Sequence, residues 1–267
     1  MVQSEKRKRL TVTDFAKMKS KGEKITMLTA YDHATASLLD SAGVDMLLVG
    51  DSLAMVVQGH ENTIPVKMEE MIYHGEMVAR AASRAFVVVD IPFPINHHGV
   101  HEAVKAAGQI MKETGCQAVK LEGGADQADV IRAMVNAGIP VIAHVGLRPQ
   151  AVHAMGGYKV QRDREELLRD ATSAEQAGAF CVLIECVPAE IASELTKKLT
   201  VPTIGIGAGS GCDGQVLVVN DMLGMTTGHV PSFVKAYANL AKQMSDAVSQ
   251  WCDDVKSSTF PDQDHSF

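Results

Sequence analysis

The stretch Phe86-Val87-Val88-Val89-Asp90 decides the fold, because four consecutive apolar residues lead directly into a carboxylate. A short, continuous apolar run is typical of a parallel strand that is buried on both faces. The chain holds eight runs that we interpret as strands of this kind. They are Ile25–Thr29, Met46–Val49, Phe86–Asp90, Ala118–Leu121, Pro140–His144, Cys181–Glu185, Thr203–Ile206 and Val216–Val219.

Helical patterns lie between most of these strands. We predict a helix that Asp32 caps and that runs through Ser41, and further helices at Pro65 to about Ala82, Val100–Thr114, Asp126–Asn136, Asp163–Gln176 and Ala189–Leu199. Gly43, Gly115, Gly138 and Gly178 stand where helices should end. Eight strands joined by helical crossovers predict a (β/α)8 TIM barrel.

We expect one barrel domain over residues 1–267, with an N-terminal helix and a helical C-terminal extension from Ser232 to about Lys256. The link between the last two strands, Gly207–Gln215, is too short for a regular helix. A doubly wound open sheet therefore stays an alternative on periodicity alone.

Composition excludes several classes of protein. The 267 residues carry a net charge of −7, with 21% charged and 46% hydrophobic residues, as in an ordinary globular enzyme. The acidic balance and 4% aromatic content argue against nucleic-acid binding. No apolar segment follows the basic run Lys6–Arg9, and no run is long enough to span a membrane. Five cysteines without a C-x-x-C pair indicate reduced thiols, so we expect a cytoplasmic protein.

Polar residues gather at the carboxyl ends of five successive predicted strands, where barrels hold their reacting groups. They are Asp51 with Ser52, Asp90, Lys120 with Glu122, His144, and Glu185. Lys120 and Glu122 are two residues apart and so lie on the same side of their strand. One charge at the end of a strand is common, whereas such a series predicts a site.

Asp51, Asp90 and Glu122 provide hard oxygen ligands on neighbouring strands. This set suits Mg²⁺, which binds a few carboxylates and retains positions for water or substrate. Zinc is less natural with so few thiols or imidazoles at these ends. Each carboxylate could instead cap the following helix or pair with Lys120.

Lys120 and Glu185 have different predicted roles. Lys120 could bind a substrate carboxylate, balance the acidic cluster or form a Schiff base, or it could make only an ion pair with Glu122. Glu185 ends an apolar strand, and partial burial would raise its pKa toward neutrality. We therefore predict that Glu185 transfers a proton, with His144 as the next candidate.

Two other patterns carry less weight. Residues 209–214 match G-x-G-x-x-G, but the run after them resembles a strand and not the helix that a dinucleotide site needs. His97, His98 and His101 resemble a metal cluster, yet they lie away from the strand ends, where a solvated helix start is expected.

The sequence closely resembles the ketopantoate hydroxymethyltransferase family over nearly its whole length. Its matching blocks are Thr29-Ala30-Tyr31-Asp32, Leu48-Val49-Gly50-Asp51-Ser52-Leu53, Val119-Lys120-Leu121-Glu122-Gly123-Gly124, Gly156-Gly157-Tyr158-Lys159-Val160-Gln161, Glu185-Cys186-Val187-Pro188, Gly205-Ile206-Gly207-Ala208-Gly209, Asp213-Gly214-Gln215-Val216-Leu217-Val218 and His265-Ser266-Phe267.

The resemblance implies a barrel of the phosphoenolpyruvate/pyruvate superfamily. It implies transfer of a hydroxymethyl group from 5,10-methylenetetrahydrofolate to 3-methyl-2-oxobutanoate, giving 2-dehydropantoate in pantothenate synthesis. It further implies Mg²⁺ on Asp51, Asp90 and Glu122, keto-acid contacts from Asp51, Ser52, Asp90 and Lys120, and Glu185 as proton acceptor. The family also implies a homo-oligomer, a decamer.

The chain departs from the family pattern at Ala54, where Gly is usual, at Arg148, where Thr is usual, and at Asn220, where His is usual. A Gly commonly found between Gln161 and Arg162 is absent. All named ligands are present. Two alternatives are kept: another Mg²⁺-dependent carbon–carbon bond enzyme of the superfamily, a lyase or mutase of small oxo acids, and a non-catalytic barrel.

Overall fold

The structure is a computed structural model that describes residues 8–267. Lys6 and Arg7 of the basic run therefore lie outside the described residues. The chain divides into two compact units, one ending at Val218 and the other spanning Val219–Phe267. Each unit is described by itself.

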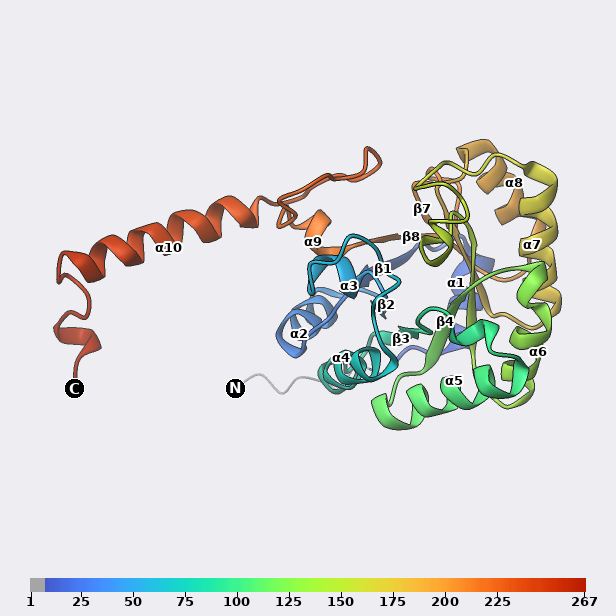
Figure 1. Cartoon of the computed structure of the whole chain (residues 1–267), viewed down its shortest axis with the longest axis horizontal. Helices are drawn as coiled ribbons and strands as arrows, with labels where there is room; N and C mark the ends of the chain where they lie inside the picture. The colour runs from blue at the N-terminus through green and yellow to red at the C-terminus, as the bar shows by residue number, and fades with distance from the viewer. Residues whose placement is uncertain (1–7) are drawn as a thin grey trace. The chain divides into compact units, whose positions relative to one another are not determined.

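The first unit is a closed barrel of eight parallel strands, in which β1 pairs with both β2 and β8 (Figure 1). The strands are β1 Ile25–Thr29, β2 Met46–Val49, β3 Phe86–Asp90, β4 Ala118–Glu122, β5 Val141–Gly146, β6 Cys181–Glu185, β7 Thr203–Ile206 and β8 Gly214–Leu217. Closure confirms the predicted (β/α)8 barrel and excludes the open sheet.

Helices cover the outside of the strands (Figure 1). They are α2 His33–Ala42, α3 Leu53–Val56, α4 Met68–Ala81, α5 Val100–Thr114, α6 Ala128–Asn136, α7 Arg164–Gln176 and α8 Ala189–Lys198. Short 3-10 turns η1 Ile95–His97, η2 Ala125–Gln127 and η3 Pro149–Ala151 lie after β3, β4 and β5. As predicted, Asp32 caps α2, because its carboxylate accepts the Thr35 N–H at 2.8 Å.

Several predicted boundaries are wrong. Strand β4 ends at Glu122 and not at Leu121, β5 spans Val141–Gly146 and not Pro140–His144, and α6 starts at Ala128 and not at Asp126. Three further boundaries differ for local reasons. Helix α4 starts at Met68 and not at Pro65, because Glu70 accepts the Lys67 N–H at 2.7 Å and fixes the start. Strand β8 starts at Gly214 and not at Val216, since Gly214 already pairs with β1 and β7. The last long helix starts at Leu240 and not at Ser232, because Asn239 caps it through the Lys242 N–H.

The barrel interior is filled by alternate residues of each strand, as the two-residue period requires. Its apolar core includes Met46, Phe86, Val88, Ile142 and Leu183, all less than 10% exposed. Counting on by two from these core residues leads to the polar residues at the carboxyl ends, as Phe86 and Val88 lead to Asp90. The barrel thus places the strand-end polar residues in one layer above an apolar core.

Helix α1, Val12–Lys21, closes the opposite end of the barrel. Phe15 is fully buried in the core and packs edge-to-face on Phe86, whose ring in turn meets Phe180. Phe86 opens β3 and Phe180 directly precedes β6, so these rings lie at the amino ends of the strands.

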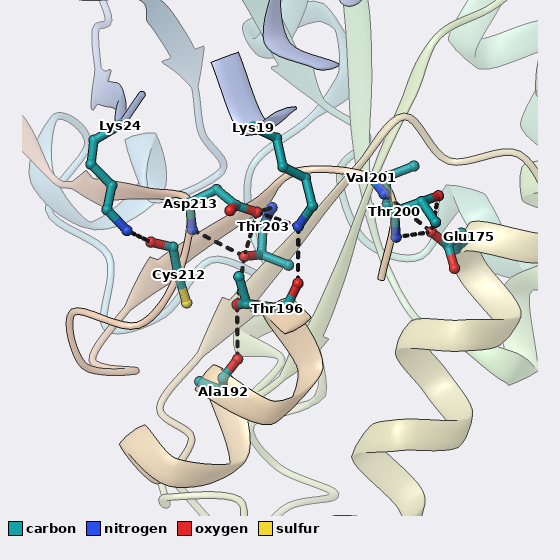
Figure 2. Close-up of polar contacts among 10 residues, drawn as sticks. All are labelled: Lys19, Lys24, Glu175, Ala192, Thr196, Thr200, Val201, Thr203, Cys212 and Asp213. Atoms are coloured by element: carbon teal, nitrogen blue, oxygen red, sulfur yellow. Dashed lines mark hydrogen bonds and ion pairs between the residues drawn. The ribbon is translucent and has the colours of Figure 1, made fainter. Parts of the chain in front are cut away.

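A polar network ties α1 to the start of β7 and β8 (Figure 2). Lys19 Nζ lies 2.7 Å from Asp213 Oδ2 and donates to the Thr196 carbonyl at 3.0 Å. Asp213 also accepts the Thr203 N–H at 2.8 Å, and Thr196 and Thr203 share a hydroxyl contact of 2.7 Å. The β7–β8 link has no helix, and this network joins the two strands at their starts.

The second unit contains α9 Val219–Met222, α10 Leu240–Lys256 and η4 Gln263–His265. No residue of α10 is buried. Within residues 8–267, none of the helices combines the length and the apolar character needed to cross a bilayer. All five cysteines are free thiols.

The Asp213→Ala substitution should lower the free energy of unfolding by about 2–4 kcal/mol, because it removes the acceptor of the Thr203 N–H and the charged partner of Lys19, which keeps only the Thr196 carbonyl. Urea unfolding followed by circular dichroism measures the loss. Lys17→Ala is the control, since Lys17 is 67% exposed and lies 3.7 Å from Asp14. Equal, small losses from both variants would contradict a structural role for the network.

Candidate active site

The layer above the apolar core contains five ionisable side chains that face the barrel axis. Asp90, Lys120, Glu122 and His144 are each less than 5% exposed, and the side chain of Glu185 is 17% exposed. They come from β3, β4, β5 and β6, and the strand register sets Asp90 beside Lys120 and Glu122 beside His144. The structure thus brings together the residues that sequence reasoning placed at strand ends.

Lys120 lies at the centre of this layer. Its Nζ is 3.1 Å from Asp90 Oδ1 and 3.2 Å from His144 Nδ1. Burial alone would lower the pKa of Lys120, but the charges of Asp90, Asp51 and Glu122 outweigh it and raise the pKa above its usual range. Lys120 therefore carries its charge at neutral pH and donates to the imidazole.

Asp51 and Asp90 are joined through the backbone. The Asp51 N–H donates to Asp90 Oδ2 at 3.0 Å. Glycine at position 50 leaves room for the Ser52 hydroxyl, because a Cβ there would lie 2.8 Å from Ser52 Oγ and would displace it. Burial raises the pKa of Asp90 to about 7, with Lys120 opposing the shift and Asp51 adding to it.

Glu122 and Asp51 meet a residue that sequence reasoning did not select, Gln150 in η3. Its backbone N–H donates to Glu122 Oε2 at 3.0 Å, and its side-chain amide donates to Asp51 Oδ2 at 2.8 Å. Burial, followed by the charge of Asp51, raises the pKa of Glu122 well above its usual range.

His144 stands between Lys120 and Glu185. Burial and then the Lys120 charge hold the pKa of His144 well below its usual range, so the ring is neutral. Its Nδ1 accepts from Lys120, and its Nε2 faces Glu185 Oε2 at 3.1 Å, outside hydrogen-bond alignment. Burial raises the pKa of Glu185 to about 7, while Lys120 opposes the shift. Glu185 can therefore exchange a proton near neutral pH.

Ser52 is oriented by a second residue that sequence reasoning missed as a site residue. The buried Tyr31 hydroxyl lies 2.8 Å from Ser52 Oγ, and His74 Nδ1 contacts the Tyr31 carbonyl at 2.6 Å. Tyr31 lies two residues after the end of β1, so its place after a strand was the available signal. Gln150 offered no such signal, because it lies four residues beyond the end of β5.

The carboxylates of Asp51, Asp90 and Glu122 have the charge that a hard cation needs, but they do not form a complete coordination shell by themselves. Three buried carboxyl groups face one buried ammonium. Glu122 Oε1 is buried and accepts no hydrogen bond, while Asp90 Oδ1 has the Lys120 ammonium at 3.1 Å. Within residues 8–267, no three His, Cys, Asp or Glu side chains converge closely enough to bind one ion unaided. A cation that retains several waters, as Mg²⁺ does, suits such a set better than one that needs a closed shell.

The structure resolves the weaker patterns. Residues 209–214 lead into strand β8, which starts at Gly214, and not into a helix, so they lack the context of a dinucleotide fingerprint. His97 ends η1 and contacts Gln127 at 3.2 Å, while the side chain of His101 is 91% exposed in α5. The three histidines form no metal site.

The departures from the family pattern leave the ionisable layer intact. Ala54 is fully buried in α3, and Arg148 forms an ion pair with Asp126 at 2.9 Å. Asn220 lies in α9 of the second unit.

Sequence comparison relates the chain to one family. The profile described as ketopantoate hydroxymethyltransferase matches residues 9–263. The 3-methyl-2-oxobutanoate hydroxymethyltransferase of Rhodopirellula baltica is 56% identical over 100% of both chains. The protein of the same name from Syntrophus aciditrophicus is 54% identical over 98% of both chains.

Solved structures with similar folds belong to more distant enzymes. Phosphonopyruvate hydrolase, in a complex with oxalate and Mg²⁺, superposes with a TM-score of 0.62 at 15% identity, covering 96% of this chain and 93% of the other. 2,3-Dimethylmalate lyase, a member of the PEP mutase/isocitrate lyase superfamily, gives a TM-score of 0.62 at 18% identity, with 96% and 91% coverage. At this identity the likeness establishes the shared barrel.

The raised pKa of Glu185 predicts a pH-dependent stability. Because the pKa is about 7 in the folded protein and near 4.5 for a free glutamate, only the folded protein keeps the proton between these values. Stability from this group is therefore full below about pH 4.5 and is lost as pH rises to about 7. Glu185→Gln removes the titration.

The melting temperature of Glu185→Gln minus that of the wild type should therefore increase by several degrees between about pH 5 and pH 8. Calorimetry in the presence of a chelator measures this difference without a contribution from bound cations. A difference that stays constant across the range would show that the Glu185 carboxyl titrates normally.

Proposed function

Because the chain belongs to the ketopantoate hydroxymethyltransferase family, we propose that it transfers a hydroxymethyl group from 5,10-methylenetetrahydrofolate to 3-methyl-2-oxobutanoate, giving 2-dehydropantoate for pantothenate synthesis. The observation that carries the proposal is the layer of Asp90, Lys120, Glu122 and Glu185 at the barrel mouth. It combines a fixed positive charge, an excess of carboxylates and, in Asp90 and Glu185, two carboxyl groups with a pKa near neutrality.

The keto acid binds through its carboxylate and keto oxygens. Lys120 is the fixed cation available to these oxygens, and Ser52 can donate a hydrogen bond when Tyr31 holds its hydroxyl in place. Lys120 acts as a charge and not as an amine nucleophile, since its pKa lies above its usual range. This favours electrostatic binding over a Schiff base.

Asp51, Asp90 and Glu122 would hold Mg²⁺. When bound, the cation would supply Lewis-acid stabilisation of negative charge on the keto oxygen. The buried oxygen Glu122 Oε1, which accepts no hydrogen bond, is available for such a ligand or for its waters. Lys120 and the cation together would offset the charge of the carboxylates around the substrate.

Glu185 removes the proton from the carbon next to the carbonyl. Its carboxylate takes that proton, and the electron pair of the broken C–H bond moves into the enolate. The enolate carbon then forms a bond to the methylene carbon of the folate as one of the two carbon–nitrogen bonds of that methylene breaks. Water displaces the second nitrogen, supplies the hydroxyl of the new hydroxymethyl group and releases tetrahydrofolate. A pKa of about 7 suits Glu185 both to accept the proton and to release it afterwards.

The runner-up function is a lyase or mutase of small oxo acids that uses the same cation. Both functions would use the acidic layer, but only the hydroxymethyltransferase needs the folate. Formation of 2-dehydropantoate from 3-methyl-2-oxobutanoate only when 5,10-methylenetetrahydrofolate is present supports the proposal. Cleavage or rearrangement of an oxo acid without folate would favour the runner-up, and no reaction at all would favour a non-catalytic barrel.

Wild-type protein with Mg²⁺ should exchange the proton next to the keto group of 3-methyl-2-oxobutanoate for deuterium without folate. Glu185→Gln should slow this exchange by about 10²–10⁴-fold, because the shape is kept and the base is lost. Proton NMR in D₂O follows the reaction.

Two controls accompany the exchange experiment. Chelation should stop exchange in the wild type and added Mg²⁺ should restore it, and the variant should still bind the keto acid. Exchange by Glu185→Gln at the wild-type rate would make His144 the next candidate base. Full exchange in metal-free protein would contradict the proposed requirement for a cation.

We also propose that the protein works as a cytoplasmic homo-oligomer, a decamer by analogy with its family. The five free thiols suit a reducing compartment. Support for self-association comes from α10, where Met244, Val248, Trp251 and Val255 are 43–58% exposed. Their spacing of four, three and four residues places them on one face of the helix.

Light scattering of the purified chain should give a mass several times 28.6 kDa. Trp251→Glu, which puts a charge into the apolar face of α10, should shift the distribution toward smaller species. An active protein that stays monomeric at working concentration would contradict the assembly.

A further inference from the structure

Gln150 makes hydrogen bonds to residues at the ends of three neighbouring strands. Its Nε2 donates to Asp51 Oδ2 at 2.8 Å and to the Ile91 carbonyl at 3.0 Å, and its backbone N–H donates to Glu122 Oε2 at 3.0 Å. Asp51 follows β2, Ile91 follows β3 and Glu122 ends β4. The side chain is 7% exposed, so these donors have little access to water.

These hydrogen bonds reach only one of the two oxygens of each carboxylate. Gln150 contacts one oxygen of Asp51 and one of Glu122, and the Asp51 N–H contacts one oxygen of Asp90. The second oxygen of Glu122, Oε1, is buried and accepts no hydrogen bond, whereas the second oxygen of Asp90, Oδ1, pairs with the Lys120 ammonium at 3.1 Å. One oxygen of each carboxylate is thereby fixed by a donor, and its rotation is restricted.

We propose that Gln150 is a positioning residue that holds Asp51 and Glu122 in the orientation in which they receive a divalent cation. This inference rests on the proposed Mg²⁺-dependent function. An amide suits the position because it donates two hydrogen bonds and carries no charge. A glutamate in its place would set a further carboxylate against Asp51, and a methionine would keep the volume but donate nothing.

The test is the affinity of the purified full-length protein for Mn²⁺, measured by electron paramagnetic resonance of the free ion and without substrate. Loss of a group that orients metal ligands usually weakens binding by about 10–100-fold. Gln150→Met should therefore raise the Kd for Mn²⁺ at least about tenfold, although the backbone bond to Glu122 is kept.

Gln117→Met is the matched control. Gln117 lies at the amino end of β4, and its side chain also makes two hydrogen bonds, from the Val87 N–H at 2.9 Å and to the Gly115 carbonyl at 2.8 Å. This variant loses a comparable set of bonds at the far end of the barrel, so it should bind Mn²⁺ as the wild type does. Gln150→Ala, which water can solvate, repeats the test should the methionine variant not fold.

The outcomes separate the inference from the function on which it rests. Weak binding by both Gln150 variants, with normal binding by Gln117→Met, supports the positioning role. Wild-type affinity in the Gln150 variants, or equal weakening in Gln117→Met, overturns that role and leaves the proposed function standing. A wild type that binds no Mn²⁺ overturns the metal-dependent function and the inference with it.

Discussion

An imbalance of buried charge governs the carboxyl end of this barrel. Asp51, Asp90 and Glu122 are buried beside a single buried ammonium, that of Lys120, the one buried lysine or arginine among residues 8–267. Such a layer is costly in a protein that binds nothing, because the carboxyl groups must take up protons or remain partly uncompensated. The raised pKa values of Asp90 and Glu122 reflect this cost. A divalent cation and an anionic substrate together would relieve it, and the proposed chemistry depends on that relief.

The amino end of the barrel contributes to stability, and the carboxyl end contains the residues proposed for the chemistry. At the amino end, Phe15 fills the core and the Lys19–Asp213 pair joins α1 to the strands, with its acceptors satisfied by neighbouring donors. At the carboxyl end, Glu122 Oε1 is buried and accepts no hydrogen bond. Satisfied polar groups stabilise a fold, whereas unsatisfied ones mark places where a ligand is expected.

Much of this could be predicted from the sequence, because both strand burial and side-chain direction follow a period of two residues. Five of the eight strands have the predicted bounds, and the strand-end residues Asp90, Lys120, Glu122 and Glu185 come together. Periodicity alone could not distinguish the predicted closed barrel from an open sheet, since the β1–β8 pairing joins residues about 190 positions apart and leaves no periodic signal. Gln150 was missed for a similar reason: its contact with Asp51 spans 99 residues and starts from a turn with no pattern of its own.

A crystal structure of the protein with 3-methyl-2-oxobutanoate and Mn²⁺, located by its anomalous signal, tests the central claim most directly. We expect one metal ion within coordination distance of at least one of Asp51, Asp90 and Glu122, with the keto acid on the same ion and Glu185 facing its methine carbon. A keto acid that binds without metal, or a metal away from these carboxylates, would contradict the claim that their excess charge is there to hold a cation.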